Sequence, residues 1–395
     1  MEALLDTHER IVRNFESRFN REMNIDWNDR LIGLTGARGV GKTSYLLNHL
    51  IHNLSENSKP LYVSMDDINF STMSLVECAD HWVKRGGTHL FIDEIHKYPY
   101  WSQELKNIYD RYAKLKVIFT GSSLLHIHSG KADLSRRAVI YVMNGLSLRE
   151  FINIQTGLNF PKVELRELLQ RHQEIAREIV SKITPLEHFD NYNKYGYYPF
   201  FLESVNSYPQ KLQSTINLML ESDLPYLRHV DVKYIHKLKK LLFLVAHALP
   251  YQPNVSKIAG DLDVSRNTIM LYLGYLEEAK LFNMLQSKSS SEANLAKPEK
   301  VYLHHPNLMY AIGKSAVQIG TVRESFFFNQ VANVYSVTAS PQSDFLVENE
   351  FTFEIGGASK SRKQLKGLNE AYVAADNLEV GSEKTIPLWL FGFLY

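Results

Sequence analysis

The sequence lacks the features of several classes of protein. Its 395 residues include a single cysteine, Cys78, which excludes an internal disulfide and a cysteine-based zinc site. No uncharged apolar run reaches the roughly 18 residues that a membrane span needs. Residues 1–20 mix charged with apolar side chains, unlike a signal peptide. We therefore expect a cytoplasmic protein with no membrane partner.

No charge of one sign dominates either. Lysine and arginine number 44 against 43 aspartate and glutamate, a formal net charge of +1, so the chain as a whole lacks the positive excess typical of polyanion binding. Internal repeats and long low-complexity tracts are also absent from the sequence. The length predicts two to four domains at about 100 to 200 residues each.

Strands and helices alternate over the first 150 residues. Apolar runs predict strands at residues 31–35, 60–65, 89–93, 116–120 and 138–143. Helical spacing predicts a leading amphipathic helix within 2–24 and further helices at 44–51, 73–85 and 101–115. This alternation favours the α/β class, with a parallel sheet covered by helices.

The pattern changes after residue 150. Long helical patterns follow at 163–183, 210–221 and 237–285. Beyond Gly313 the pattern is mixed α/β, with strands expected near 344–355 and 386–394.

A glycine-rich turn joins the first predicted strand to the next helix. It fits the P-loop pattern G-x-x-x-x-G-K-[ST], in which successive N–H groups and the positive end of a helix cradle phosphates. The phosphate-binding residues would be Gly36, Ala37, Arg38, Gly39, Val40, Gly41, Lys42, Thr43 and Ser44. Lys42 would contact the phosphates and Thr43 would ligate Mg²⁺. This pattern occurs by chance in on the order of one chain in a hundred. A chance match that also has a predicted strand before it and a predicted helix after it is rarer.

A second pattern supports the first. The strand predicted at 89–93 ends in two carboxylates, Asp93 and Glu94. Asp93 would hold Mg²⁺ directly or through water, and Glu94 would act as general base toward the attacking water. The alternative is a solvated strand end. Together the patterns predict ATP and Mg²⁺ as cofactors, and GTP is less expected because an Asn-Lys-x-Asp motif is missing.

Two further groups could complete the site. Thr120 and Ser122 end the next predicted strand, where a hydroxyl would lie beside the γ-phosphate or the attacking water, although such clusters usually form turns. Arg136 and Arg137 precede the strand at 138–143. Either could neutralise transition-state charge, in cis or from a second copy in a homo-oligomer, or could form a surface salt bridge.

These motifs, in order and spacing, resemble a prokaryotic family of AAA-type ATPases that carry a C-terminal winged helix and a nuclease-like domain of unknown function. Residues 145–151 resemble the segment that closes the ATPase core of that family. Residues 195–199 resemble its glycine-proline motif in the helical lid, and 300–308 its segment after the winged helix. The resemblance implies a sensor role for Thr120 or Ser122, and it favours Arg137 over Arg136.

The resemblance also implies four domains: an ATPase core at 1–150, a helical lid at 151–226, a winged helix at 227–312 and a restriction-endonuclease-like α/β domain at 313–395. The residue pattern independently supports one of these domains, the winged helix. Residues 254–273 predict helix, turn and helix, with Ser265 as N-cap and Ile269, Leu273 and Leu276 on one face. A flexible wing is expected near 287–299.

DNA binding by this module is weighed against simple packing. Between Asn254 and Phe282 three basic residues face four acidic ones, whereas phosphate contacts require cations. The lysines within 233–240 could still form a basic surface. We therefore leave the macromolecular partner, DNA or protein, open, with packing slightly favoured.

The nuclease-like domain is expected to be inactive. Glu324, Asp344 and Glu354 occupy the acidic positions, but Gly356 stands where such enzymes have a lysine. Lys360 could reach back from a neighbouring position. Without an ammonium group there, little stabilises the developing charge.

The sequence therefore favours an ATPase whose binding and hydrolysis of ATP drive a conformational switch passed to the winged-helix and C-terminal domains. One alternative is an ATP-dependent nuclease or DNA-processing protein. Another is a signalling module that nucleotide locks in one shape with negligible turnover.

Overall fold

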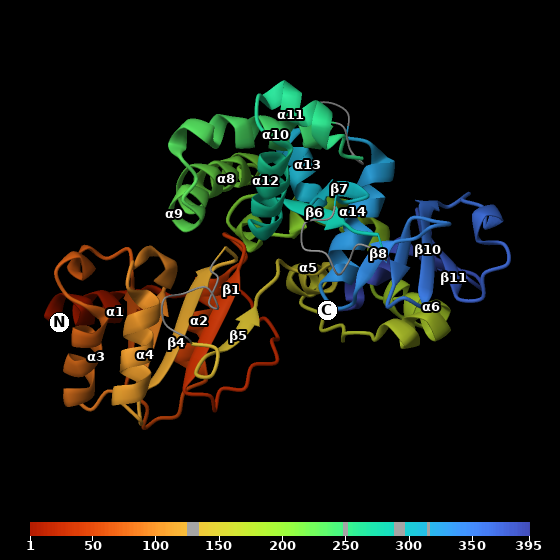
Figure 1. Ribbon diagram of the computed structural model, residues 1–395. Coiled ribbons are helices and arrows are strands. Elements are labelled where there is room, and N and C mark those ends of the chain that lie inside the picture. The colour runs from red at the N-terminus through yellow and green to blue at the C-terminus, as the bar shows by residue number, and fades with distance from the viewer. Residues whose placement is uncertain (125–133, 248–251, 288–296, 314–316) are drawn as a thin grey trace. The chain divides into compact units, whose positions relative to one another are not determined.

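The computed structural model of the protein describes residues 1–124, 134–247, 252–287, 297–313 and 317–395. The chain divides into two compact units, Met1–Asn144 and Gly145–Tyr395, and each contains a five-stranded sheet (Figure 1). The four domains expected from the sequence are a finer division than this and stay a prediction. Within the described ranges, no helix is both long enough and apolar enough to cross a membrane.

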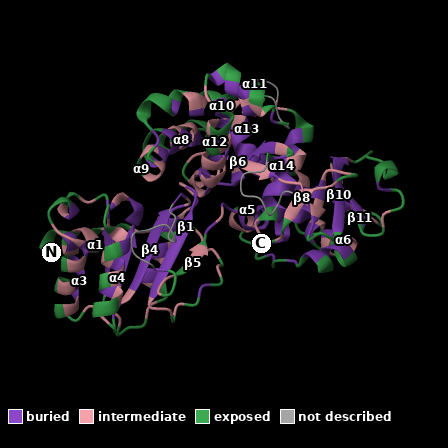
Figure 2. Ribbon diagram, viewed as in Figure 1, coloured by how far each residue is buried: buried purple, intermediate pink, exposed green. Residues whose placement is uncertain are grey.

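The first unit is built on a five-stranded parallel sheet with the order β2-β3-β4-β1-β5. Its strands are β1 Leu31–Gly36, β2 Pro60–Ser64, β3 His89–Asp93, β4 Lys116–Ser122 and β5 Val139–Val142. All five expected strands and the α/β class are confirmed. The inner strands are buried almost throughout (Figure 2), which explains why they read as continuous apolar runs.

The α-helices among the described residues of this unit are α1 Glu2–Asn14, α2 Lys42–His52, α3 Leu75–Lys84 and α4 Trp101–Arg111. A capping box starts α3, because the Ser74 hydroxyl accepts from the Glu77 N–H and the Glu77 carboxylate accepts from the Ser74 N–H. Cys78 lies on the buried face of α3, and burial raises the pKa of its thiol to about 12. The one cysteine therefore packs as an apolar side chain.

The second unit begins with helices, as the pattern beyond residue 150 predicts. They are α5 Leu148–Thr156, α6 Leu165–Val180, α7 Pro185–Asn191, α8 Tyr208–Leu218, α9 Leu224–Arg228 and α10 Ile235–His247. A π-helical turn, Met219–Asp223, joins α8 to α9. The helix expected at 210–221 is therefore confirmed, with its last turn wound more loosely.

The expected helix-turn-helix is present as α11 Val255–Leu262 and α12 Arg266–Glu278. Ser265 caps α12 by accepting from the Thr268 N–H at 3.1 Å, and the predicted apolar face of α12 is buried. The helical pattern expected up to residue 285 is wrong at its end. Lys280 adopts a left-handed backbone conformation that ends the helical region, and the chain continues as β6 Phe282–Leu285.

Strand β6 pairs antiparallel with β7 Lys300–Leu303. Helix, turn, helix and a two-stranded sheet is the order of elements expected for a winged helix. Residues 288–296, which make up most of the expected wing, lie outside the described residues.

The chain then forms α13 Pro306–Ile312, α14 Ile319–Ala332 and a second five-stranded sheet with the order β12-β11-β10-β9-β8. Its strands are β8 Val337–Ala339, β9 Phe345–Val347, β10 Phe351–Gly357, β11 Ala371–Asp376 and β12 Thr385–Pro387. Figure 1 shows α14 and this sheet as neighbours in the last part of the chain.

Two strands expected in this region need correction. The strand at 344–355 is two antiparallel strands, β9 and β10, because Glu348 and Asn349 take left-handed conformations that reverse the chain. The strand at 386–394 ends at Pro387, and Leu388–Phe393 is a 3-10 helix. All residues of this 3-10 helix are buried, so its sequence is apolar throughout. Apolar periodicity alone cannot distinguish such a segment from a buried strand.

Three segments far apart in sequence meet in one buried polar network of the second unit. They are the segments 145–151, 195–199 and 300–308 that carry the family resemblance. The Leu146 N–H donates to the Tyr197 carbonyl at 2.8 Å, and the Tyr197 N–H donates to Asn307 Oδ1 at 2.9 Å. A Cβ on Gly145 would lie 2.3 Å from the Tyr197 ring, so this contact requires glycine.

Asn307 is the centre of that network and is fully buried. Its Oδ1 also accepts from the Tyr208 hydroxyl at 2.5 Å. Its Nδ2 donates to the carbonyls of Tyr192 at 2.8 Å and Asn193 at 2.7 Å. A side-chain amide offers two donors and two acceptor positions, so its hydrogen-bonding capacity is fully used.

Replacing Asn307 by leucine should lower the free energy of unfolding of the second unit by about 3 kcal/mol or more. Leucine has a similar volume but leaves the buried partners without a hydrogen bond, at about 1–3 kcal/mol each. Chemical denaturation measures the loss. The control is Asn267→Leu, at an exposed position of α12, which should change stability by less than about 0.5 kcal/mol. Equal stability of the two variants would contradict the assigned role of Asn307.

Candidate nucleotide site

The residues predicted to bind phosphate form a loop in the first unit. β1 ends at Gly36 and α2 begins at Lys42, so the loop has the strand before it and the helix after it that the P-loop motif requires. Gly39 and Gly41 have φ values of 85° and 97°, which glycine adopts far more readily than other residues. A Cβ on Gly36 would lie 2.2 Å from the Met143 carbonyl oxygen, so this position also requires glycine.

The start of α2 adds donors to this loop. The first N–H groups of a helix have no acceptor within it, and their dipoles give that end a partial positive charge. Gly41 is the N-cap of α2 and has no side chain to cap these groups. The loop and the first turn of α2 therefore suit an anion such as a phosphate.

The side chain of Lys42 folds back over the loop and is buried. Its Nζ donates to the carbonyls of Gly36 at 3.0 Å and Ala37 at 2.9 Å. These contacts hold the ammonium beside the loop amides, where its charge stabilises any negative charge placed among them.

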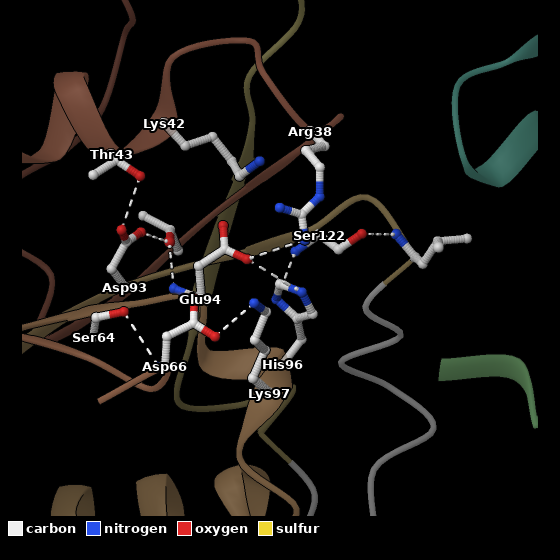
Figure 3. A network of polar contacts seen from close by, with 12 residues as sticks. Arg38, Lys42, Thr43, Ser64, Asp66, Asp93, Glu94, His96, Lys97 and Ser122 are labelled. Atoms are coloured by element: carbon white, nitrogen blue, oxygen red, sulfur yellow. Dashed lines mark hydrogen bonds and ion pairs between the residues drawn. The ribbon is translucent and has the colours of Figure 1, made fainter. Parts of the chain in front are cut away.

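The carboxylate of Asp93, at the end of β3, accepts hydrogen bonds from three hydroxyl groups. Oδ2 accepts from Thr43 Oγ1 at 2.8 Å and from the Tyr62 hydroxyl at 2.9 Å. Oδ1 accepts from Thr120 Oγ1. Thr43 and Asp93, the two expected metal ligands, are thus brought together (Figure 3). A hydroxyl and a carboxylate oxygen are ligands that Mg²⁺ takes, so the donor set fits that ion.

Glu94 has different surroundings. Its backbone is left-handed, with φ 53° and ψ 40°, and its N–H donates to Thr120 Oγ1 at 3.0 Å. Its carboxylate lies 3.9 Å from the guanidinium of Arg38 and 3.4 Å from Nε2 of His96. Burial raises the pKa of Glu94, which strengthens it as a proton acceptor.

The two candidate sensor residues lie on β4, which neighbours β3. Thr120 contacts the acidic pair directly, through the Asp93 carboxylate and the Glu94 N–H. Ser122 contacts it through His96, because the Ser122 N–H donates to His96 Nδ1 at 3.3 Å.

Arg137 lies elsewhere in the first unit. It precedes β5, whose first residue pairs with Ile32 near the start of β1, whereas the phosphate loop follows the end of β1. Its guanidinium donates to both carboxylate oxygens of Asp110, at 2.9 and 3.1 Å. Arg136 is exposed beside it. The structure does not bring either arginine to the phosphate loop of its own chain, and a contribution across a subunit interface stays a prediction.

Sequence reasoning missed two residues of this site. Tyr62 reads as one more position of an apolar strand, yet the pairing of β2 with β3 brings its hydroxyl to Asp93. His96 lies in the 3-10 turn Ile95–Lys97, which returns its ring toward Glu94. The order of the strands would have identified Tyr62, but the sequence does not reveal that order.

The acidic residues of the expected nuclease-like site lie in the second unit, beside two lysines. Lys300 Nζ lies 3.5 Å from a carboxylate oxygen of Glu324 and 3.6 Å from one of Asp344. Lys360 pairs with Glu354, which is buried. In the part of the chain that the structure describes, no group of three or more histidine, cysteine, aspartate or glutamate residues is placed to hold a metal ion.

Lys360 occupies the space of the missing side chain at position 356. A Cβ on Gly356 would lie 2.6 Å from Cβ and Cγ of Lys360. The ammonium of Lys360 therefore reaches Glu354 from the neighbouring position that the sequence suggested. The ammonium that Gly356 cannot supply is present beside Glu354, so the reason for inactivity drawn from the sequence does not hold, and the inactivity of this domain stays a prediction.

The lysines within 233–240 interact with their own chain. Lys237 and Lys240 donate to the main-chain carbonyls of Asp263 and Asp261, at 2.8 and 3.0 Å, where α11 ends. The other two lysines form ion pairs with carboxylates of this chain. Cations stabilise the C-terminal end of a helix, so these contacts favour packing over DNA binding.

Replacing Lys360 by methionine should lower the free energy of unfolding by about 2 kcal/mol. Breaking a fully buried pair costs about 3–5 kcal/mol, and the side chain of Lys360 is 35% exposed. Denaturant titration measures the loss, with exposed Lys363→Met as control. The double variant Glu354→Gln/Lys360→Met should recover part of it, because an amide needs no counter-charge. A loss no larger than that of Lys363→Met would show that the pair contributes nothing.

Comparison with known proteins gives two family matches. Residues 28–152 match the family described as AAA domain, and residues 186–317 match the domain of unknown function DUF8612. An uncharacterized protein of Methanocaldococcus jannaschii is 26% identical over 386 residues, covering 89% of this chain and 81% of the relative.

Solved structures show weaker similarity. The Aeropyrum pernix ORC1 protein in complex with DNA has a TM-score of 0.31 and 13% identity, over 80% of this chain and 92% of that one. A signal-transduction ATPase with a tetratricopeptide repeat sensor from Pyrococcus horikoshii has a TM-score of 0.25 and 14% identity, over 81% of this chain but 47% of that one. At these TM-scores the similarity says nothing about what this chain binds.

The AAA-domain match includes the phosphate loop, the acidic pair at the end of β3 and the hydroxyl groups of β4. These are the residues whose geometry is described above. Residues 28–152 are therefore an AAA-type P-loop domain, which confirms the resemblance for this part of the sequence.

Proposed function

We propose that the first unit binds Mg-ATP and hydrolyses it, and that this cycle drives a conformational switch passed to the rest of the chain. The observation that carries the proposal is the hydrogen bond of Thr43 to Asp93 beside the buried ammonium of Lys42. It places a hydroxyl, a carboxylate and a cation around one loop of main-chain donors. The AAA-domain match supports nucleotide binding by the same residues.

Each part of the loop has a task in this proposal. The N–H groups of Gly36 to Ser44 and the ammonium of Lys42 would hold the β- and γ-phosphates. Thr43 and Asp93 would hold Mg²⁺, which neutralises charge on the phosphoryl oxygens when bound. Thr43 and Asp93 already contact each other, so little reorganisation is needed to hold the ion.

Glu94 would accept the proton of the attacking water. Its half-buried carboxylate has a raised pKa, and Glu94 directly follows the residue that would hold the metal. Thr120 contacts both Asp93 and the Glu94 main chain. A shift of these two residues on loss of the γ-phosphate would therefore also move Thr120 and the end of β4. This contact supports a sensor role for Thr120.

A nucleotide-locked module with negligible turnover is the second candidate. One observation favours it: the guanidinium of Arg38 lies 3.9 Å from the carboxylate of Glu94, and a cation there would lower the ability of Glu94 to accept a proton. An ATP-dependent nuclease has less support, because the ammonium of Lys300 lies beside the carboxylates of Glu324 and Asp344, where it would compete with a metal ion for both.

Replacing Lys42 by alanine should weaken ATP binding roughly 10- to 150-fold, the equivalent of about 1.5–3 kcal/mol for a charge-assisted hydrogen bond. Isothermal titration with Mg-ATP measures the affinity, and phosphate release measures turnover, which should also fall. Lys114→Ala, at an exposed position of the same unit, should match the wild-type protein. Normal affinity and turnover in the Lys42 variant would refute the assignment.

Replacing Glu94 by glutamine should leave ATP affinity within about threefold and lower turnover by on the order of 100-fold, because the amide cannot accept the proton. The two effects are measured by titration and by phosphate release on the same preparation. A slow wild-type rate that Glu94→Gln leaves unchanged would favour the nucleotide-locked module instead.

A further inference from the structure

His96 lies between the candidate general base and the end of β4. Its side chain is buried, and Nε2 is 3.4 Å from Glu94 Oε2 (Figure 3). On the other side of the ring, Nδ1 accepts from the Ser122 N–H at 3.3 Å. The Ser122 hydroxyl in turn accepts from the Leu124 N–H at 3.2 Å. The ring therefore connects the main chain at the end of β4 to the carboxylate of Glu94.

The main-chain donor determines which nitrogen carries the proton. A neutral imidazole has one donor nitrogen and one acceptor nitrogen. Nδ1 faces the N–H of Ser122, so it must be the acceptor, and the proton lies on Nε2. Nε2 then lies 3.4 Å from Glu94 Oε2, and a small movement of either side chain would let its N–H donate to that oxygen.

We propose that His96 is a positioning residue for hydrolysis: it donates from Nε2 to Glu94, orients that carboxylate toward the attacking water, and couples it to the end of β4. The inference rests on the proposed function and deepens it. It adds a second contact between β4 and the acidic pair, since Thr120 contacts Asp93 and His96 joins Ser122 to Glu94.

A neutral donor suits this task. A hydrogen bond from an uncharged ring orients the carboxylate without cancelling its charge, so Glu94 keeps its ability to accept a proton. The guanidinium of Arg38, 3.9 Å from the same oxygen, is a cation and would lower that ability if it became the main partner. If Ser122 moved away, Nδ1 would no longer accept a hydrogen bond from its N–H, and the proton would no longer be confined to Nε2. Movement of β4 would in this way change the hydrogen bond that His96 offers to Glu94.

The test compares two variants of His96. His96→Phe keeps a buried ring but removes the donor and the acceptor. It should lower kcat about tenfold with the KM for ATP within about threefold, since one positioning contact of about 1.4 kcal/mol corresponds to a factor of ten. His96→Gln keeps one donor and one acceptor and should restore kcat to within about threefold of the wild-type value. Thermal melting shows that both variants are folded.

A second comparison separates positioning from packing. If His96 acts through Glu94, adding His96→Phe to a Glu94→Gln variant should change its residual rate less than twofold. An equal tenfold loss in both backgrounds would overturn the proposal. So would an unchanged kcat in His96→Phe, or a loss in His96→Gln as large as in His96→Phe.

The protonation of the ring gives a readout that does not depend on turnover. In protein labelled with ¹⁵N-histidine, the signal that disappears in His96→Gln belongs to His96, and it should show an unprotonated Nδ1. A protonated Nδ1 in a protein that hydrolyses ATP would overturn the role of His96 alone. Absence of turnover in the wild-type protein would overturn the proposed hydrolysis and this role together, so the two failures are distinguishable.

Discussion

One buried carboxylate organises the candidate nucleotide site. Asp93 accepts hydrogen bonds from Thr43 on α2, Tyr62 on β2 and Thr120 on β4. Each donor comes from a different element, so the full set of contacts exists only when β2, β3 and β4 are paired and α2 packs against them. Folding of the first unit and assembly of the site are therefore one event, and the oxygen atoms are placed before any ligand binds.

The two acidic sites of the chain differ in how their charge is balanced. Hydroxyl groups surround Asp93, and they orient the carboxylate without cancelling its charge. In the second unit, ammonium groups of Lys300 and Lys360 lie against the carboxylates. The negative charge of Asp93 therefore stays available to a metal ion, whereas these carboxylates of the second unit are already neutralised by lysines. This difference is why we assign chemistry to the first unit.

The segments that carry the family resemblance in the second unit have a structural explanation. Gly145 lets the chain pass close to the ring of Tyr197. Asn307 forms hydrogen bonds with the main chain at both ends of the π-helical segment Tyr192–Gly196: its Nδ2 donates to the Tyr192 carbonyl, and its Oδ1 accepts from the Tyr197 N–H. Buried polar groups must be paired, so such positions accept few alternatives. Packing and hydrogen bonding therefore account for these residues.

The sequence by itself determined the parallel α/β core, the phosphate loop and the acidic pair, because each depends on a local pattern: a buried strand, a glycine turn with positive φ, a helix start. Only the tertiary structure decided the partners of these residues. The position of Tyr62 beside Asp93 and the distance of Arg137 from the phosphate loop follow from strand order and register. The return of His96 to Glu94 and of Lys360 over Gly356 follows from turns. Contacts of this kind join residues through space, and apolar periodicity carries no information about which strand lies next to which.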